Sequence, residues 1–277
     1  MSTGDTRGQD DGLSLQDNLI GIGNAGKTTV THYLSQDWIV ERAVAGQNED
    51  DEFSAFIIDT ATDEQFADER DVERINDNIE QVAEEFGKDP DLIDTGIQYI
   101  NPLDDAPDTL ISRTGLTSQA TVSRIAKQDN LSAWWLENNS DMLTDGYSEG
   151  VLRRRGLSKA LYHASRASKS GSGLNLKDLP NNLAGRPQDR TVTMVAGLGG
   201  GTGSGMFLDL AKTLKEEGAT VNLVASIPGL DEKNRRTANA FAALSELEYL
   251  ALNGNNPFKS IVLVPFGSAK RLSNKDT

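Results

Sequence analysis

Residues 197–205 carry the strongest chemical signal in this sequence. They read Gly-Leu-Gly-Gly-Gly-Thr-Gly-Ser-Gly, so six of the nine residues are glycine. An apolar, β-rich run at 191–196 precedes them, and an amphipathic helical pattern begins at Met206. Glycines let a backbone approach a ligand closely, and N–H groups at a helix N-terminus attract anions. The succession of strand, glycine loop and helix therefore predicts a phosphate-binding site.

A second glycine loop, at 21–28, satisfies two motifs at once. Gly21, Gly23 and Gly26 have the spacing of a dinucleotide fingerprint, while 21–28 also reads as a complete Walker A motif. In a Walker site Lys27 would reach the β/γ-phosphates and Thr28 would hold Mg²⁺. A P-loop ATPase that uses Gly21–Thr28 therefore stays open as an alternative.

The acidic residue after the next predicted strand helps to distinguish the dinucleotide and Walker interpretations of the first loop. That strand, at 55–58, leads into Asp59. The dinucleotide reading expects an acid about 20 residues beyond the glycines, and Asp59 lies well past that distance. A Walker ATPase needs a second apolar strand that ends in an aspartate for magnesium, and Asp59 would serve.

Composition excludes several classes of function. The 277 residues carry a formal net charge of −15, which argues against nucleic acid or anionic membrane as partners. There is no cysteine and there are two histidines, so thiolate and His-rich metal centres are excluded. No apolar run reaches the roughly 18 residues of a membrane span, and the acidic N-terminus lacks a signal pattern. These features predict a cytoplasmic protein, and the acidity further suggests a halophilic one.

Predicted strands and helices alternate along the chain. This order predicts an α/β fold, a three-layer Rossmann-like, mainly parallel sheet with helices on both faces. Residues 1–17 are expected to be a disordered tail, and 18–277 one nucleotide-binding domain with an irregular helical insertion at about 88–146. The predicted strands are 18–20, 55–58, 191–196, 221–227 and 260–264, and the predicted helices are 27–35, 67–86, 118–127, 151–168, 206–217 and 235–252.

The two glycine loops together resemble the tubulin/FtsZ superfamily. Its signature, Gly-Gly-Gly-Thr-Gly-(Ser/Thr)-Gly, is present as Gly199–Gly205, and its first loop has the form found at Gly21–Gly26. The run at 235–248 and the arginines at 153–155 look like the prokaryotic tubulin-like group. By themselves, these three arginines read as a solvated basic turn. The resemblance implies the nucleotide-binding domain of a cytoskeletal-type protein that binds GTP or GDP.

The resemblance also implies roles for individual residues. Backbone N–H groups of Gly201, Thr202 and Gly203 would bind phosphate, Mg²⁺ would be held through the phosphates, and Glu232 and Arg236 would approach the ribose or α-phosphate. Asp59 and Asp63 are weak candidates for metal or ribose contact. The full predicted site is Gly23, Asn24, Ala25, Gly26, Lys27, Thr28, Gly199, Gly200, Gly201, Thr202, Gly203, Ser204, Gly205, Glu232 and Arg236.

Activity and assembly follow from the same resemblance. The family hydrolyses GTP in head-to-tail filaments, with an acidic loop that acts on the neighbouring subunit's nucleotide. That loop, within a C-terminal activation domain, is expected beyond Thr277, so no catalytic residue is assigned here and the chain is expected to bind with little hydrolysis. Self-association is expected of the full-length protein. Phe266 stands where FtsZ has a base-contacting Asn, so the base stays open, as does a nucleotide-independent scaffold.

Overall fold

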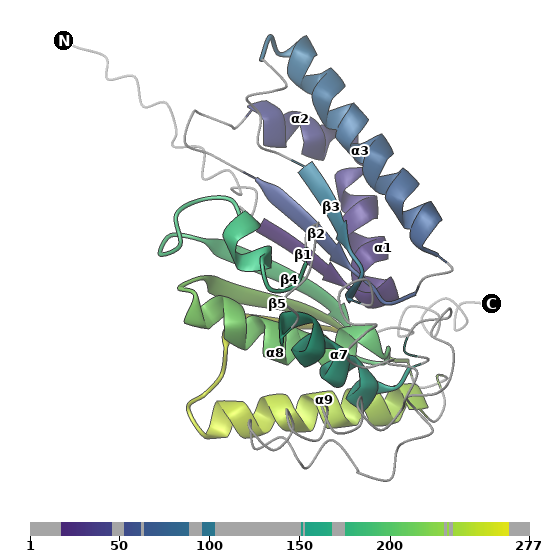
Figure 1. The fold of residues 1–277 in the computed structure, drawn as a ribbon, viewed down its shortest axis with the longest axis vertical. Coiled ribbons are helices and arrows are strands. Elements are labelled where there is room, and N and C mark those ends of the chain that lie inside the picture. The colour runs from purple at the N-terminus through teal and green to yellow at the C-terminus, as the bar shows by residue number, and fades with distance from the viewer. Residues whose placement is uncertain are drawn as a thin grey trace, which may run out of the picture.

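Short runs of apolar and β-branched residues form the strands of a six-stranded parallel sheet in the computed structural model (Figure 1). The structure describes residues 18–45, 53–61, 64–88, 96–102, 151, 153–167, 175–229, 232 and 235–265. Every residue of the two strands near the sheet centre, β1 and β2, is buried, as expected for strands covered on both faces. The strands are β1 (Asn18–Ile22), β2 (Ser54–Ile58), β3 (Gly96–Ile100), β4 (Thr191–Gly197), β5 (Thr220–Ile227) and β6 (Phe258–Pro265).

Helices cover both faces of this sheet, which confirms the predicted three-layer α/β fold (Figure 1). Side chains alternate between the faces along each strand, so Leu19 joins one buried cluster and Ile20 the other. On the first face lie α1 (Gly23–Leu34), α2 (Asp37–Ala45) and α3 (Gln65–Glu85). On the second face lie α7 (Arg155–Ala167), α8 (Thr202–Glu216) and α9 (Arg235–Leu252), with a short 3₁₀ helix, η3 (Leu179–Asn182), beside them.

The order of the strands creates a crevice at the sheet centre. The order is β3-β2-β1-β4-β5-β6, and β1 pairs in parallel with β2 on one side and with β4 on the other. The chain therefore builds outward in one direction from β1 and then returns to build in the other. Ligands of open parallel sheets bind at such a switch point, beyond the carboxyl ends of the strands. Both glycine loops follow the two strands that meet there.

The first helix begins earlier than its predicted start at Lys27. Residues 23–26, predicted as a loop, form the first turn of α1. Their glycines allow that turn to lie directly on the sheet. A Cβ at Gly26 would lie 2.3 Å from the carbonyl oxygen of Val195, so only glycine fits at this contact. The motif spacing therefore serves helix packing as well as ligand approach.

Three of the described elements were not expected from the sequence, and the shortest is η3, which lies between the predicted helix at 151–168 and the predicted strand at 191–196. The strand β3 pairs with β2 within the region read as an irregular insertion, and its sequence, Gly-Ile-Gln-Tyr-Ile, lacks the continuous apolar run that marked β2. The helix α2 follows α1 after two residues, so its periodicity merges with that of α1. The rest of that insertion, including the predicted helix at 118–127, and the predicted tail at 1–17 lie outside the described residues. None of the described helices is long and apolar enough to cross a membrane.

Candidate functional site

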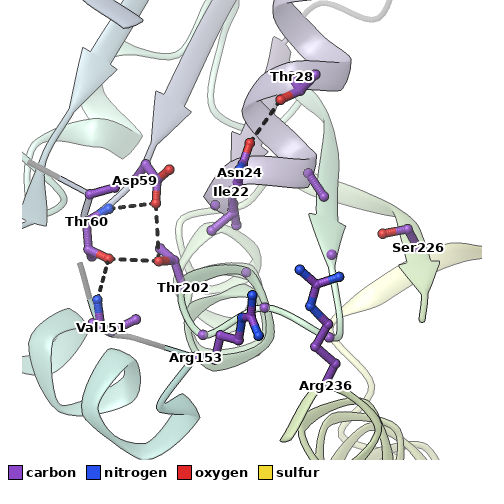
Figure 2. Close-up of a pocket in the computed structure, with 18 of the residues that line it drawn as sticks. Ile22, Asn24, Thr28, Asp59, Thr60, Val151, Arg153, Thr202, Ser226 and Arg236 are labelled. Carbon is purple, nitrogen blue, oxygen red and sulfur yellow. Dashed lines mark hydrogen bonds between the residues drawn. The ribbon is translucent and has the colours of Figure 1, made fainter. Parts of the chain in front are cut away.

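A pocket of about 1030 Å³ lies at the switch point, between the first turns of α1 and α8 (Figure 2). Its size is at the upper end of the usual range for small-molecule sites. Backbone atoms of both glycine loops form much of its wall. Its lining is Ile22, Gly23, Asn24, Ala25, Thr28, Thr29, Asp59, Thr60, Ala61, Glu64, Val151, Arg153, Gly197, Gly199, Gly200, Gly201, Thr202, Gly203, Ser226, Pro228, Glu232, Arg235 and Arg236.

Two helix N-termini reach this pocket without a side-chain cap. Ile22 precedes α1 and Gly201 precedes α8, and neither makes a capping hydrogen bond from its side chain. Neither helix has an acidic residue in its first turn. The first N–H groups of a helix have no partner within the helix, and the helix dipole adds positive potential there. The pocket is therefore suited to an anion.

Glycine is required where the two loops meet. Gly23 has a φ of +68°, and a Cβ on it would lie 2.8 Å from the backbone nitrogen of Gly203. A Cβ on Gly203 would lie 2.8 Å from the carbonyl oxygen of Gly197 and 3.0 Å from that of Ile22. At Gly200 the nearest atom to an added Cβ would be the carbonyl oxygen of Gly197 at 3.6 Å, an ordinary van der Waals contact, so a side chain fits here without a clash. Gly23 and Gly203 are thus needed for packing, whereas Gly200 is free to serve a ligand.

The hydroxyl of Thr202 belongs to a buried hydrogen-bond chain (Figure 2). It donates to Oδ1 of Asp59 across 3.3 Å, since a carboxylate can only accept. It lies 2.8 Å from the hydroxyl of Thr60, which in turn accepts from the N–H of Val151 across 3.3 Å. The chain joins the end of β2, the start of α8 and the turn before α7. The hydroxyl proton of Thr202 is engaged here, which leaves its backbone N–H for a ligand.

Lys27 does not line the pocket, and its ammonium lies among three carboxylates, of which Asp59 and Glu64 do line it. Lys27 is 5% exposed, and its Nζ lies 3.1 Å from Asp59, 2.5 Å from Glu64 and 2.8 Å from Asp68. Burial alone would lower the pKa of Lys27, but hydrogen bonds to Asp68 and Glu64 and the charge of Asp59 raise it above its ordinary value. The three carboxylates lie close enough together to hold a metal ion. Here the lysine ammonium supplies the compensating charge.

Charged side chains from two further segments line the cavity. Glu232, which precedes α9, forms an ion pair with Arg236 in the first turn of that helix. Arg153 lies in the turn before α7 with a φ of 61°, a conformation uncommon for a residue with a side chain. Figure 2 shows the side chains of Arg153 and Arg236 in the same cavity. Arg153 is thus a pocket residue, whereas Arg155 is paired with Glu246 behind it.

Most of the predicted site residues come together in this pocket. Those that line it are Gly23, Asn24, Ala25, Thr28, Gly199, Gly200, Gly201, Thr202, Gly203, Glu232, Arg236 and the weak candidate Asp59. Four predicted residues do not line it: Gly26, Lys27, Ser204 and Gly205. Asp63 lies outside the described residues.

Ser204 and Gly205 have other contacts that explain their place in the motif. The Ser204 hydroxyl donates to the carbonyl of Gly200. A Cβ on Gly205 would lie 2.5 Å from Cβ of Ser158, so glycine allows α8 to pack closely on α7. The lining residues outside the predicted site are Ile22, Thr29, Thr60, Ala61, Glu64, Val151, Arg153, Gly197, Ser226, Pro228 and Arg235.

Comparison with known proteins gives a family for the second half of the chain. Residues 152–270 match the family described as "Tubulin like". This segment includes the second glycine loop, so the resemblance inferred from that loop is confirmed there. A search of curated proteins finds no match.

The solved structures that resemble this chain include a CetZ, an FtsZ and a TubZ protein. CetZ2 from Haloferax volcanii, in a GTPγS-bound protofilament, is 17% identical, with 91% of this chain and 49% of that chain covered and a TM-score of 0.46. The FtsZ dimer of M. jannaschii is 15% identical, with 95% and 48% covered and a TM-score of 0.45. TubZ of Bacillus thuringiensis is 13% identical, with 95% and 51% covered and a TM-score of 0.42. The chain spans about half the length of these structures.

Proposed function

From the premise that residues 152–270 are tubulin-like, we propose that this chain is a GTP-binding domain of the tubulin/FtsZ type. One observation carries the proposal. Two uncapped helix N-termini meet at one pocket, at the switch point of a parallel sheet. That arrangement suits a phosphate chain, because each helix start offers unpaired N–H groups and positive potential.

Different lining residues would contact different parts of the nucleotide. The N–H groups of Gly201, Thr202 and Gly203 would donate to the phosphates, opposite the first turn of α1. Glu232 and Arg236 would flank the sugar end, and the guanidinium of Arg153 would add charge beside α8. Mg²⁺ would enter with the phosphates and neutralise part of their charge, as it usually keeps several waters.

For the full-length protein, the proposal extends to a cytoskeletal role. The tubulin-like segment favours head-to-tail self-association of the full-length protein, with GTP hydrolysis in the assembled form. For this chain the proposal is confined to binding, and no residue is assigned to the hydrolytic step.

Two rival nucleotide sites are disfavoured by the surroundings of Lys27 and Asp59. A Walker lysine must reach phosphate, whereas Nζ of Lys27 lies within 3.1 Å of three carboxylates. A dinucleotide site needs a free acid after its second strand. The carboxylate of Asp59 instead accepts from Thr60 and Thr202 and pairs with Lys27.

The direct test is to identify the nucleotide that binds. Purified protein is denatured and any released nucleotide is separated by chromatography, and calorimetry then measures binding of GTP, GDP, ATP and NAD to the emptied protein. We expect guanine nucleotide in both measurements. Binding of ATP alone would favour the P-loop alternative. Absence of binding to all four would contradict the proposal and favour a nucleotide-independent scaffold.

Substitution at Gly200 tests the position of the phosphates. We expect Gly200→Val to lower GTP affinity at least about tenfold, because its Cβ fits without a backbone clash and its side chain adds bulk to the pocket wall beside the proposed phosphates. Gly203→Val is a poor test, because a Cβ there strikes the Gly197 carbonyl and would disturb the fold. Gly96→Val, on the edge strand β3, is the matched control and should bind normally. Wild-type affinity in Gly200→Val would place the phosphates elsewhere.

A further inference from the structure

One side chain binds three backbone carbonyls behind the glycine loop. Nδ2 of Asn239, on α9, lies 3.3 Å from the carbonyl oxygen of Gly199, 3.0 Å from that of Gly200 and 2.9 Å from that of Arg153. Asn239 is 8% exposed, so water competes little for these bonds. An amide nitrogen carries two hydrogens, and two of the three acceptors therefore share one of them.

Side chains of α7 bind further carbonyls on the same side of the loop. Oγ of Ser158 donates to the carbonyl of Thr202 across 3.2 Å, and Nε of Arg155 donates to the carbonyl of Ser204 across 3.0 Å. The carbonyl oxygens of Gly199, Gly200, Thr202 and Ser204 therefore accept hydrogen bonds from side chains of α7 and α9. The opposite side of this segment, at Gly199–Gly203, is the wall of the pocket.

The orientation of these carbonyls sets the orientation of the neighbouring N–H groups. In a trans peptide the C=O of one residue and the N–H of the next point in opposite directions. With the carbonyl of Gly200 bound by Asn239, the N–H of Gly201 points away from α9. Without Asn239 this carbonyl would keep the Ser204 hydroxyl as a donor but would lose its bond to α9. A turn of the peptide would then present the partial negative charge of its oxygen to an anion.

Asn239 also fixes the turn that carries Arg153. A Cβ on Gly201 would lie 2.8 Å from Cα of Arg153, so this turn and the glycine loop are in direct contact. The N–H of Arg154 donates to Val151 across 2.7 Å and closes the turn. The bond from Asn239 to the Arg153 carbonyl therefore joins both backbone segments to α9.

We propose that Asn239 is a positioning residue for phosphate binding. By holding the carbonyls of Gly199, Gly200 and Arg153, it keeps the N–H groups at the start of α8 turned toward the phosphates. This inference rests on the proposed function, but it names a residue that touches no ligand. Asn239 is the buried asparagine that ends the Arg-Arg-x-Ala-Asn run at 235–239, and the inference gives this residue a role.

The test replaces the amide with a group of the same shape that cannot donate. Asn239→Asp places a carboxylate against the three carbonyls. The matched control is Asn253→Asp, because Asn253 is exposed and donates to a single carbonyl, that of Tyr249, across 2.7 Å. Asn239→Ser keeps one O–H donor, so this second variant can be measured if Asn239→Asp fails to fold. GTP affinity is measured by calorimetry, and backbone hydrogen exchange is measured by mass spectrometry.

We expect Asn239→Asp to bind GTP at least about tenfold more weakly, with faster exchange at 198–203 and unchanged exchange in β2. We expect Asn239→Ser to fall between the aspartate variant and the wild type. Lower pH should restore affinity in the aspartate variant alone, because carbonyl neighbours favour the protonated carboxyl, which can donate. A general loss of stability would not produce that pH dependence.

The outcomes separate the inference from the proposed function. Unchanged affinity or unchanged loop exchange in Asn239→Asp would overturn the inference, as would an equal loss in Asn253→Asp. A wild-type protein that binds no GTP would overturn the proposed function, and with it the link to phosphate. In that case loop exchange would still show whether Asn239 holds the loop.

Discussion

Lys27 shows how neighbouring side chains decide what a motif residue does. In sequence it stands in a complete Walker A motif, yet in the fold it belongs to the ion pairs with Asp59, Glu64 and Asp68. Two of these partners lie on or just before α3, about 40 residues along the chain. The glycine pattern shapes the backbone of α1, and the acids direct the lysine to a structural role.

Replacing Lys27 separates the P-loop alternative from the proposed function. We expect Lys27→Met to lower the free energy of unfolding by about 3–5 kcal/mol, because three carboxylates lose their partner. We expect GTP affinity of the folded variant to remain within a few-fold of wild type. Denaturant unfolding and calorimetry measure the two quantities. Intact stability with GTP binding abolished would instead identify a phosphate-binding lysine.

The sequence predicts the residues whose backbone lines the pocket. It misses those whose role depends on hydrogen-bond partners far away along the chain. Gly199–Gly203 were predicted because a glycine run between a strand and a helix is typical of phosphate binding, and these residues line the pocket. Thr60 and Asn239 were not predicted as site residues, although Asn239 lies in the run at 235–248. The partners of Asn239 lie 39, 40 and 86 residues away, and no short motif encodes such separations.

Among the elements, α7, α8 and α9 are joined by a buried group of charges. Lys159 is fully buried, and its Nζ lies 2.7 Å from Asp209 and 3.0 Å from Glu246. Burial would raise the pKa of both carboxyls. His163 and Lys159 nevertheless hold that of Asp209 well below its ordinary value, and Lys159 and Arg155 lower that of Glu246. The helices behind the glycine loop thus depend on ionised acids.

These pKa shifts predict acid sensitivity of the helical layer. A carboxyl with a lowered folded-state pKa stabilises the protein above its unfolded pKa of about 4, and that contribution is lost as pH falls through the folded value. We therefore expect the free energy of unfolding to fall below about pH 4. Glu246→Gln should be less stable at neutral pH and should lose less on acidification. Glu248→Gln, at an exposed site on α9, should match the wild type throughout.

Element boundaries were predictable where periodicity runs long. The helix predicted at 235–252 has the observed bounds of α9, because a sustained apolar stripe repeats along it. The strand β3 has five residues and is identified by its pairing with β2. Neither the order of the strands nor the position of the pocket between β1 and β4 can be read from one strand alone, because both depend on pairing across the whole sheet.

For the whole molecule, the net charge of −15 predicts a response to salt. Acidic side chains repel one another in the folded protein, and salt screens this repulsion. We expect the melting temperature to rise as KCl is increased toward molar concentration. Sucrose at equal osmolality serves as the control for a non-ionic solute effect. A melting temperature that is flat or falls with KCl would contradict both the repulsion and the suggested adaptation to salt.

The hydrogen-bond chain from Asp59 through Thr202 and Thr60 to Val151 has a consequence for the order of folding. The two threonines are 142 residues apart, and Thr60 and Val151 are 91 apart. Contacts of such separation close long loops, so they form after the local helices and neighbouring strand pairs. We therefore expect the floor of the pocket to be assembled late, past the main barrier to folding. A ligand held there would then stabilise contacts that are absent from the transition state, so it would slow unfolding and leave the folding rate nearly unchanged.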